Sequence, residues 1–194
     1  MSIYFLLLSI MVFLIYEGII SSLFYAPKKI KIISIIALFL MTFRYIALII
    51  LLIAANQNYL YLLKPAVYTN FLSIPICGIL SIFIFARNNK IKLRKILLIC
   101  IMLFIVYFIV IYKSSANIII SNLCGYTITF ELEDYCNVAL LIINTIFIVK
   151  GIELFNKTYS NKLGAILIII SARYYINISY SNFNKYKFRM VIVM

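Results

Sequence analysis

A succession of long apolar runs, joined by short polar connections, constrains this 194-residue chain more than any other feature. A helix needs about 20 mostly apolar residues to cross a bilayer. The composition agrees, because 66% of the residues are hydrophobic and 12% are charged, whereas soluble domains are about 45–50% apolar and about 25% charged. We therefore predict an all-α, polytopic transmembrane helical bundle as a single domain over residues 1–180. Its first five spans are predicted at 3–26, 32–55, 66–86, 96–112 and 138–155.

A sixth segment, 163–178, has a shorter apolar run and contains Arg173. It either crosses the membrane or lies along the inner interface as an amphipathic helix, and we favour crossing. Crossing would place the basic residues Lys185, Lys187 and Arg189 outside, against the usual charge bias. Residues 181–194 are predicted to form a basic tail, interpreted either as disordered or as the end of a shortened reading frame.

Basic residues predict the orientation of the spans, since cytoplasmic loops carry an excess of Lys and Arg. The connections after the first, third and fifth spans hold eleven bases, and those after the second and fourth hold only Lys64 and Lys113. The N-terminus is therefore predicted to lie outside a cell membrane. The first run is too long for a cleavable signal peptide and has no basic residue before it. The eleven bases are Lys28, Lys29, Lys31, Arg87, Lys90, Lys92, Arg94, Lys95, Lys150, Lys157 and Lys162.

Charged residues inside the spans are candidates for a functional site, because they cost about 2.5–3.5 kcal/mol each at the bilayer centre. Glu17 and Arg44 lie at similar depths in the first two spans, which a very short turn joins. We predict an intramembrane Glu17–Arg44 ion pair, either as a lock on the helical hairpin or as a ligand, ion or proton site. Alternatively, both residues face water or other partners. Arg173 either competes for Glu17 or extends its head group to an interface.

The third span carries small or polar residues at every fourth position, namely Ser73, Cys77 and Ser81. This spacing is typical of helices that pack closely in membranes, so we interpret the face as a packing surface. Pro75, which removes a backbone donor, is expected to kink the helix. A gate or substrate path along this kink is the alternative interpretation.

The connection at 113–136 is the longest and holds three of the five acidic residues: Glu131, Glu133 and Asp134. Apolar and polar residues alternate from Tyr126 to Glu133, a period of two that predicts a strand or extended segment. Residues 117–120 are placed to pair with it. The acidic residues form either a recognition surface for a cation or a basic peptide, or a solvated loop.

Two cysteines, Cys124 and Cys136, fall in this same outer connection. An extracellular environment permits oxidation, so a Cys124–Cys136 disulfide is possible. The two other cysteines, Cys77 and Cys100, lie within spans and are interpreted as small hydrophobic residues.

Several classes of function are excluded by what the sequence lacks. The chain has no His, which removes Ser-His-Asp catalysis and His-ligated metal sites. No nucleotide-binding or zinc-protease motif occurs. We therefore predict no enzyme, no cofactor and no metal site. Nucleic-acid binding is not expected, because the basic residues cluster at the ends of apolar runs.

Two hypotheses for the function remain. The first is a sensor or an accessory or scaffold subunit, which acts through a membrane-protein partner or as a homo-oligomer. In architecture alone the chain resembles the multi-pass sensor halves that precede bacterial histidine kinases, which would imply a bacterial cell membrane. The alternative is a transporter or permease component with a midplane site around Glu17 and Arg44.

Overall fold

The computed structural model describes residues 2–54, 60–86, 93–121, 125–158 and 160–193, and 86% of these described residues are helical. Within these residues, five helical segments are long and apolar enough to cross a membrane. They are Ile3–Tyr25, Ile30–Ile53, Leu60–Ala86, Arg94–Lys113 and Glu133–Asn156. The prediction of a mainly helical chain is thus confirmed, apart from a hairpin described below, and each of the first five predicted spans overlaps one of these segments. The chain divides into two compact units.

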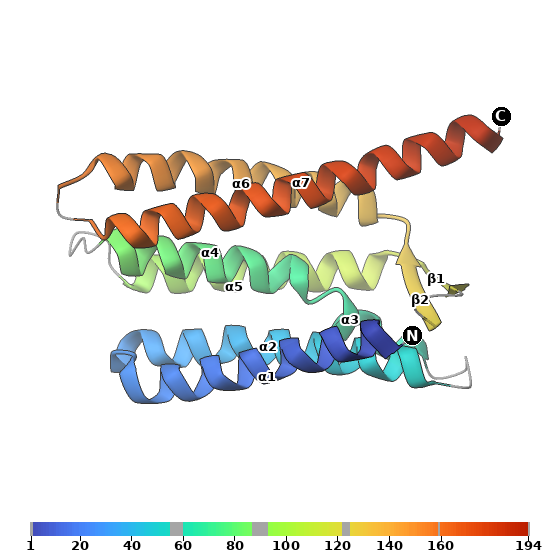
Figure 1. The fold of residues 1–194 in the computed structure, drawn as a ribbon, viewed down its shortest axis with the longest axis horizontal. Coiled ribbons are helices and arrows are strands. Elements are labelled where there is room, and N and C mark those ends of the chain that lie inside the picture. The colour runs from blue at the N-terminus through green and yellow to red at the C-terminus, as the bar shows by residue number, and fades with distance from the viewer. Residues whose placement is uncertain (1, 55–59, 87–92, 122–124, 159, 194) are drawn as a thin grey trace. The chain divides into compact units, whose positions relative to one another are not determined.

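Unit 1 comprises residues 1–77 and 97–131. Helix α1 (Ser2–Tyr25) packs along α2 (Lys28–Ile53), and the two lie side by side in Figure 1. Pro27 lies in the turn between them, and its carbonyl accepts the backbone N–H of Ile30 and of Lys31, which begins α2. Gly18 faces Leu38, whose methyl groups would lie 3.6 and 3.8 Å from a Cβ at Gly18.

The chain between α2 and the third long helix is not one straight span. A 3-10 turn, η1 (Leu60–Leu63), leads into α3 (Lys64–Val67), and a turn at Tyr68 and Thr69 precedes α4 (Asn70–Ala86). We call residues 60–69 the linker. The fourth long helix is α5 (Leu93–Lys113).

A two-stranded antiparallel hairpin follows α5. Strand β1 (Ala116–Ser121) pairs with β2 (Gly125–Phe130), with Ile118 opposite Ile128. The period-two pattern therefore predicted this pairing correctly. Ile128 and Phe130 are buried at 5% exposure each, while Thr127 and Thr129 are half-buried and Glu131 is exposed, so one face of β2 packs inward.

Unit 2 comprises residues 78–96 and 132–194. Helix α6 (Glu133–Asn156) packs along α7 (Lys162–Val193), as an antiparallel pair in Figure 1. Phe147, Ile168 and Ala172 form its buried core, with Ile79, Ile82 and Phe85 of α4 packed against them. Asn161 begins α7: its carbonyl accepts the Ala165 N–H, its side chain accepts the Gly164 N–H, and its own N–H donates to the Phe85 carbonyl.

Two features of unit 2 concern the predicted sixth span and tail. Helix α7 is not one of the five helices of the described chain that are long and apolar enough to cross a membrane. Its first half nevertheless packs against α6, which is one of those five helices. The helix also continues to Val193, through the residues expected to form a separate tail.

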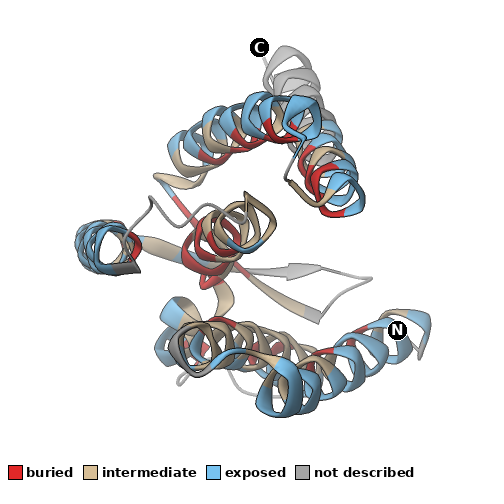
Figure 2. Cartoon of the chain, turned by 90° about the vertical axis from the view of Figure 1, so that its left-hand side faces the viewer, coloured by how far each residue is buried: buried red, intermediate tan, exposed pale blue. Residues whose placement is uncertain are grey.

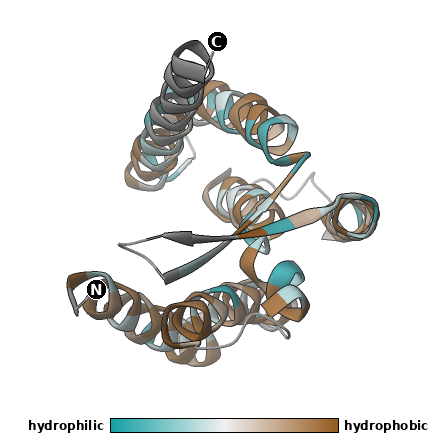
Figure 3. Cartoon of the chain, turned by 90° about the vertical axis from the view of Figure 1, so that its right-hand side faces the viewer, coloured by the Kyte–Doolittle hydropathy of each residue, from teal (hydrophilic) through white to brown (hydrophobic). Residues whose placement is uncertain are grey.

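Large apolar side chains cover the outside of the long helices instead of being buried between them. Phe24 is 80% exposed and Met102 is 66% exposed, and pale blue dominates α1 in Figure 2. The same helices are largely brown in the hydropathy colouring of Figure 3. Exposed apolar surface on this scale is unfavourable in water and suits a lipid environment, so the helices indicate a membrane location.

Candidate functional site

The linker is connected by side-chain hydrogen bonds to the hairpin and to two helices of unit 1. Lys64 lies at the start of α3, and its ammonium group donates to the carbonyls of Ile111, at 2.8 Å, and of Ser114. The last carbonyls of a helix have no partner within the helix and carry partial negative charge. Lys64 therefore caps the C-terminal end of α5.

Tyr68, at the turn after α3, connects the linker to the hairpin. Its hydroxyl donates to the Ile128 carbonyl of β2. Its ring meets Phe130 edge to face, with 4.3 Å between ring centroids, and stacks on Phe71 at 5.8 Å. Such aromatic pairs add about 0.5–1.5 kcal/mol beyond area burial. Tyr68 thus holds β2 by both a polar and an apolar contact.

Two further hydrogen bonds anchor the linker backbone. The Arg44 Nε–H of α2 donates to the Val67 carbonyl at 3.3 Å, and the Tyr107 hydroxyl of α5 donates to the Pro65 carbonyl. Side chains from α2 and α5 therefore satisfy carbonyls of α3, whose four residues have few internal partners. The hairpin, α2 and α5 are all fastened to the same five-residue stretch, 64–68.

The structure does not bring Glu17 and Arg44 together. Besides its bond to Val67, the Arg44 guanidinium lies 5.6 Å from the Tyr45 ring centroid, whereas Glu17 is exposed on α1. Arg173 is likewise exposed, on α7. The ion pairs found among the described residues are Lys150–Glu153 and Lys157–Glu153.

The predicted packing face of α4 is partly buried. Ser73 is fully buried, and its hydroxyl has no hydrogen-bond partner among the described residues. Cys77 and Ser81 are half-buried. Pro75 is also fully buried, and α4 continues through it as one helix. This burial is compatible with a packing role.

The acidic residues follow β2 directly. Glu131 is exposed, and Glu133 and Asp134 lie in the first turn of α6, where negative charge favours a helix N-terminus. Cys136 is a free thiol, and its predicted partner Cys124 lies outside the described residues. Glu131 and Asp134 are thus both exposed and follow the last residue of β2 within four positions of the sequence.

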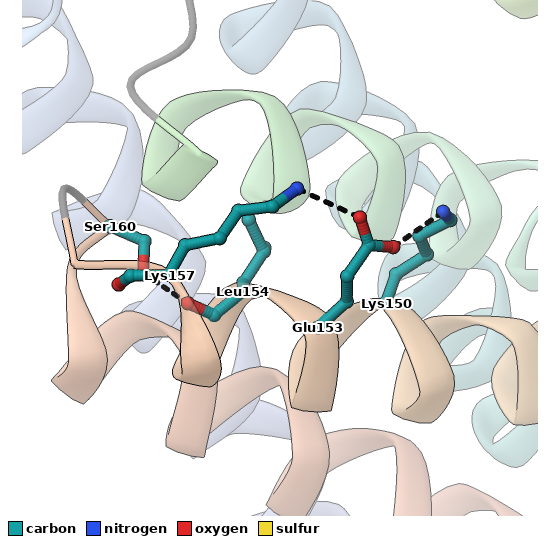
Figure 4. Close-up of polar contacts among 5 residues, drawn as sticks. All are labelled: Lys150, Glu153, Leu154, Lys157 and Ser160. Atoms are coloured by element: carbon teal, nitrogen blue, oxygen red, sulfur yellow. Dashed lines mark hydrogen bonds and ion pairs between the residues drawn. The ribbon is translucent and has the colours of Figure 1, made fainter.

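A charged cluster at the other end of α6 was not predicted as a unit. Glu153 accepts hydrogen bonds from Lys150 at 2.7 Å and from Lys157 at 2.8 Å, as Figure 4 shows. The spacings of three and four residues place all three on one helix face. All three side chains are about half exposed, so each pair contributes little to stability.

No group of three or more metal-binding side chains occurs in the described ranges. A surface depression of about 300 Å³ on α6 is lined by that helix alone, between Leu141 and Lys150, and lacks the converging polar groups of a ligand site. The contacts at the linker hold helix ends and a strand in place.

Sequence reasoning missed Lys64 and Tyr68 as key residues. Their partners are 47 to 60 residues away along the chain, and no periodic pattern links such distant positions. The one available signal was the position of Lys64, which is one of only two bases in the predicted outer connections.

Tyr68→Phe is expected to loosen the hairpin while keeping the aromatic contacts. Loss of one neutral hydrogen bond costs about 0.5–1.5 kcal/mol, so amide hydrogens of β1 and β2 should exchange several-fold faster. Hydrogen–deuterium exchange with mass spectrometry measures this. The control is Tyr112→Phe, because Tyr112 is 94% exposed. Equal protection of the hairpin in both variants would contradict the role of the Tyr68 hydroxyl.

Comparison with known proteins identifies no relative: no family model, no curated protein and no solved structure matches the chain.

Proposed function

We propose that this chain is a small multi-pass membrane protein, without catalytic machinery, that acts as a sensor or accessory subunit through a protein partner. The observation that carries the proposal is the attachment of the hairpin to α2 and α5 through residues 64–68. A contact that shifts β2 acts directly on Tyr68, and through the short α3 on the capped end of α5. The hairpin is therefore suited to pass a binding event to the helices.

The partner surface in this proposal is the outward part of the hairpin and the acidic residues that follow it. Ile128 and Phe130 are buried, so recognition falls to the opposite face of β2 and to Glu131 and Asp134, which are exposed. Carboxylates at such a rim attract a basic segment and set its orientation. We propose a protein with a basic extracellular segment as the partner.

The proposed orientation puts this hairpin outside a cell membrane. It relies on the basic connections after the first, third and fifth spans and on the positive-inside tendency. Single cysteines at Ser2 and at Ser115, in a background without other cysteines, should react with a membrane-impermeant maleimide in intact cells. Protection of both until the cells are lysed would overturn the orientation.

A transporter built on Glu17 and Arg44 has less support. The Arg44 side chain is directed to Val67 and Tyr45, and Glu17 is exposed on α1. A midplane transport site needs its polar groups to converge. Flux into proteoliposomes that Glu17→Gln abolishes would favour the transporter over the accessory subunit.

The proposed recognition surface is tested by removing two charges without changing side-chain shape. Glu131→Gln with Asp134→Asn should abolish recovery of the partner that co-purifies with the wild-type chain in mild detergent. The matched control is Asn156→Lys with Thr158→Lys, which changes the net charge equally at exposed positions near the far end of α6 and leaves the carboxylates and the hairpin unchanged. Retention of the partner by the neutralised variant, or equal loss in the control, would refute the acidic surface.

A further inference from the structure

Helix α6 carries a shallow depression that suits a hydrocarbon chain. Its volume is about 300 Å³, and its walls are the side chains of Leu141, Ile142, Thr145, Ile146, Val149 and Lys150. The one hydroxyl group in these walls, that of Thr145, donates to the Leu141 carbonyl at 2.9 Å. The walls therefore offer apolar surface from Leu141 as far as Lys150, and a polar ligand would find little there to bind.

The depression lies on the side of α6 that is turned away from the core of unit 2. The face of α6 that packs against α7 and α4 is defined by its buried residues, Leu140, Asn144, Phe147, Gly151 and Leu154. At about 100° per residue, Ile142, Ile146 and Val149 lie roughly opposite that face, and all three are exposed. Within unit 2, the depression is therefore open to lipid.

Two lysines continue the same side of α6 beyond the depression. From Ile146, spacings of four, three and four residues lead to Lys150, Glu153 and Lys157, which keeps these side chains on one helix face. The two oxygens of Glu153 accept one hydrogen bond each from Lys150 and Lys157, at 2.7 and 2.8 Å (Figure 4). An ammonium group has three donors, so each lysine keeps donors for an anion, and the three charges sum to one positive charge.

The length of this arrangement matches one leaflet of a bilayer. Leu141 and Lys150 are nine residues apart, which is about 14 Å along the helix and close to half of the roughly 30 Å hydrocarbon core. The bond from Lys150 to Glu153 directs its ammonium group toward the end of α6, as expected of a lysine that reaches the head-group region. A chain in the depression thus ends where the lysines begin.

We propose that this face of α6 binds an anionic phospholipid, with an acyl chain in the depression and the phosphate at Lys150 and Lys157. Charge complementarity selects this occupant: a zwitterionic lipid brings its own cation close to the lysines, and a free phosphate leaves the depression empty. The proposed orientation places this end of α6 in the cytoplasmic leaflet, which is rich in anionic lipids. The site relies on that orientation only for its leaflet, and it is independent of recognition at the hairpin.

Tryptophan fluorescence tests the site in the full chain, which has no native Trp. Ile142→Trp places a reporter in the depression, and Leu167→Trp places a control on α7, at similar exposures of 54% and 62%. In phosphatidylcholine vesicles, quenching by brominated phosphatidylglycerol and by brominated phosphatidylcholine gives a relative binding constant for the two lipids at each position. Ile142→Trp should favour phosphatidylglycerol about fivefold, the effect of one positive charge near an anionic surface, and Leu167→Trp should show almost no preference.

The lysines are tested in the Ile142→Trp background. Lys150→Gln should remove the preference, whereas the control Lys162→Gln should keep it, because the Lys162 ammonium lies over the Phe155 ring, 6.0 Å from its centroid, on a different side of α6. Inorganic phosphate should not reduce quenching by the lipid, since it cannot fill the depression.

Four results would overturn the lipid site. These are equal preferences at the two Trp positions, a preference that survives Lys150→Gln, an equal loss in Lys162→Gln, and displacement of the lipid by inorganic phosphate. Absence of quenching at Ile142→Trp by either lipid would also overturn it, because another part of the chain would then cover the depression. None of these results affects partner capture by the hairpin, so the two proposals fail separately.

Discussion

Gly78→Ala is expected to destabilise unit 2 by about 1–3 kcal/mol, the usual cost of forcing an extra carbon into a packed core. A Cβ at Gly78 would lie 2.1 Å from Cε2 of Phe147 and 2.5 Å from its Cζ. Real Cβ contacts do not approach this distance, so α4 and α6 must separate or the Phe147 ring must move. The ring belongs to the buried core with Ile168 and Ala172, which leaves it little room.

The measurement is unfolding in mixed micelles of increasing SDS content, followed by circular dichroism. Gly18→Ala is the matched control, since its Cβ would meet Leu38 at an ordinary 3.6 Å. There the lower entropy of the unfolded chain should stabilise the protein by about 0.4–1 kcal/mol. A second variant, Gly78→Ala with Phe147→Leu, should recover part of the loss. A stabilising effect of Gly78→Ala alone would show that α4 and α6 do not approach as closely as described.

The positions of the long apolar helices could be predicted from sequence, because length and apolarity are local properties of the chain. The run at 32–55, for example, corresponds to a helix at Ile30–Ile53 that is long and apolar enough to cross a membrane. The hairpin could be predicted for a similar reason: alternation from Tyr126 to Phe130 is a local pattern, and β2 ends at Phe130. Both are properties of consecutive residues.

The Glu17–Arg44 pair shows what such patterns leave open. The depth of a residue along a helix can be estimated from its residue number, and by that estimate Glu17 and Arg44 lie at similar depths. The direction in which each side chain points from the helix axis also depends on the neighbouring elements that pack against the helix. Arg44 turns toward Val67 because the short α3 helix leaves a carbonyl there for it, and Glu17 lies on the exposed side of α1. The linker that redirects Arg44 was predicted as part of a continuous third span and its preceding loop.

Gly78 is a further example. In the sequence Gly78 is one small residue next to Cys77, and no local pattern names its partner. Its close contact is with Phe147, 69 positions later in the chain. Small residues predict that some helix approaches closely, but the identity of that helix is decided by the whole arrangement of unit 2.

Lys64→Met should have the largest effect among substitutions in the linker, with a loss of about 1.5–3 kcal/mol, the range for a hydrogen bond to a charged group. Methionine keeps most of the side-chain volume but cannot donate to Ile111 and Ser114. Ser114 is 6% exposed, so its carbonyl has little access to replacement water. Because Lys64 itself is only half-buried, solvent screening keeps the expected loss below that of two fully buried charged bonds.

The control for this substitution is Lys113→Met. Lys113 also lies at the C-terminal end of α5 and carries the same charge, but its side chain is exposed, so its loss should cost about 0.3–1 kcal/mol through the helix dipole. Unfolding in SDS compares the two variants. Hydrogen exchange adds a positional test: Lys64→Met should speed exchange at the end of α5 and in the hairpin, since residues 64–68 fasten both. Similar losses for the two lysines would mean that charge near the helix end is sufficient and that the bonds from Lys64 are not required.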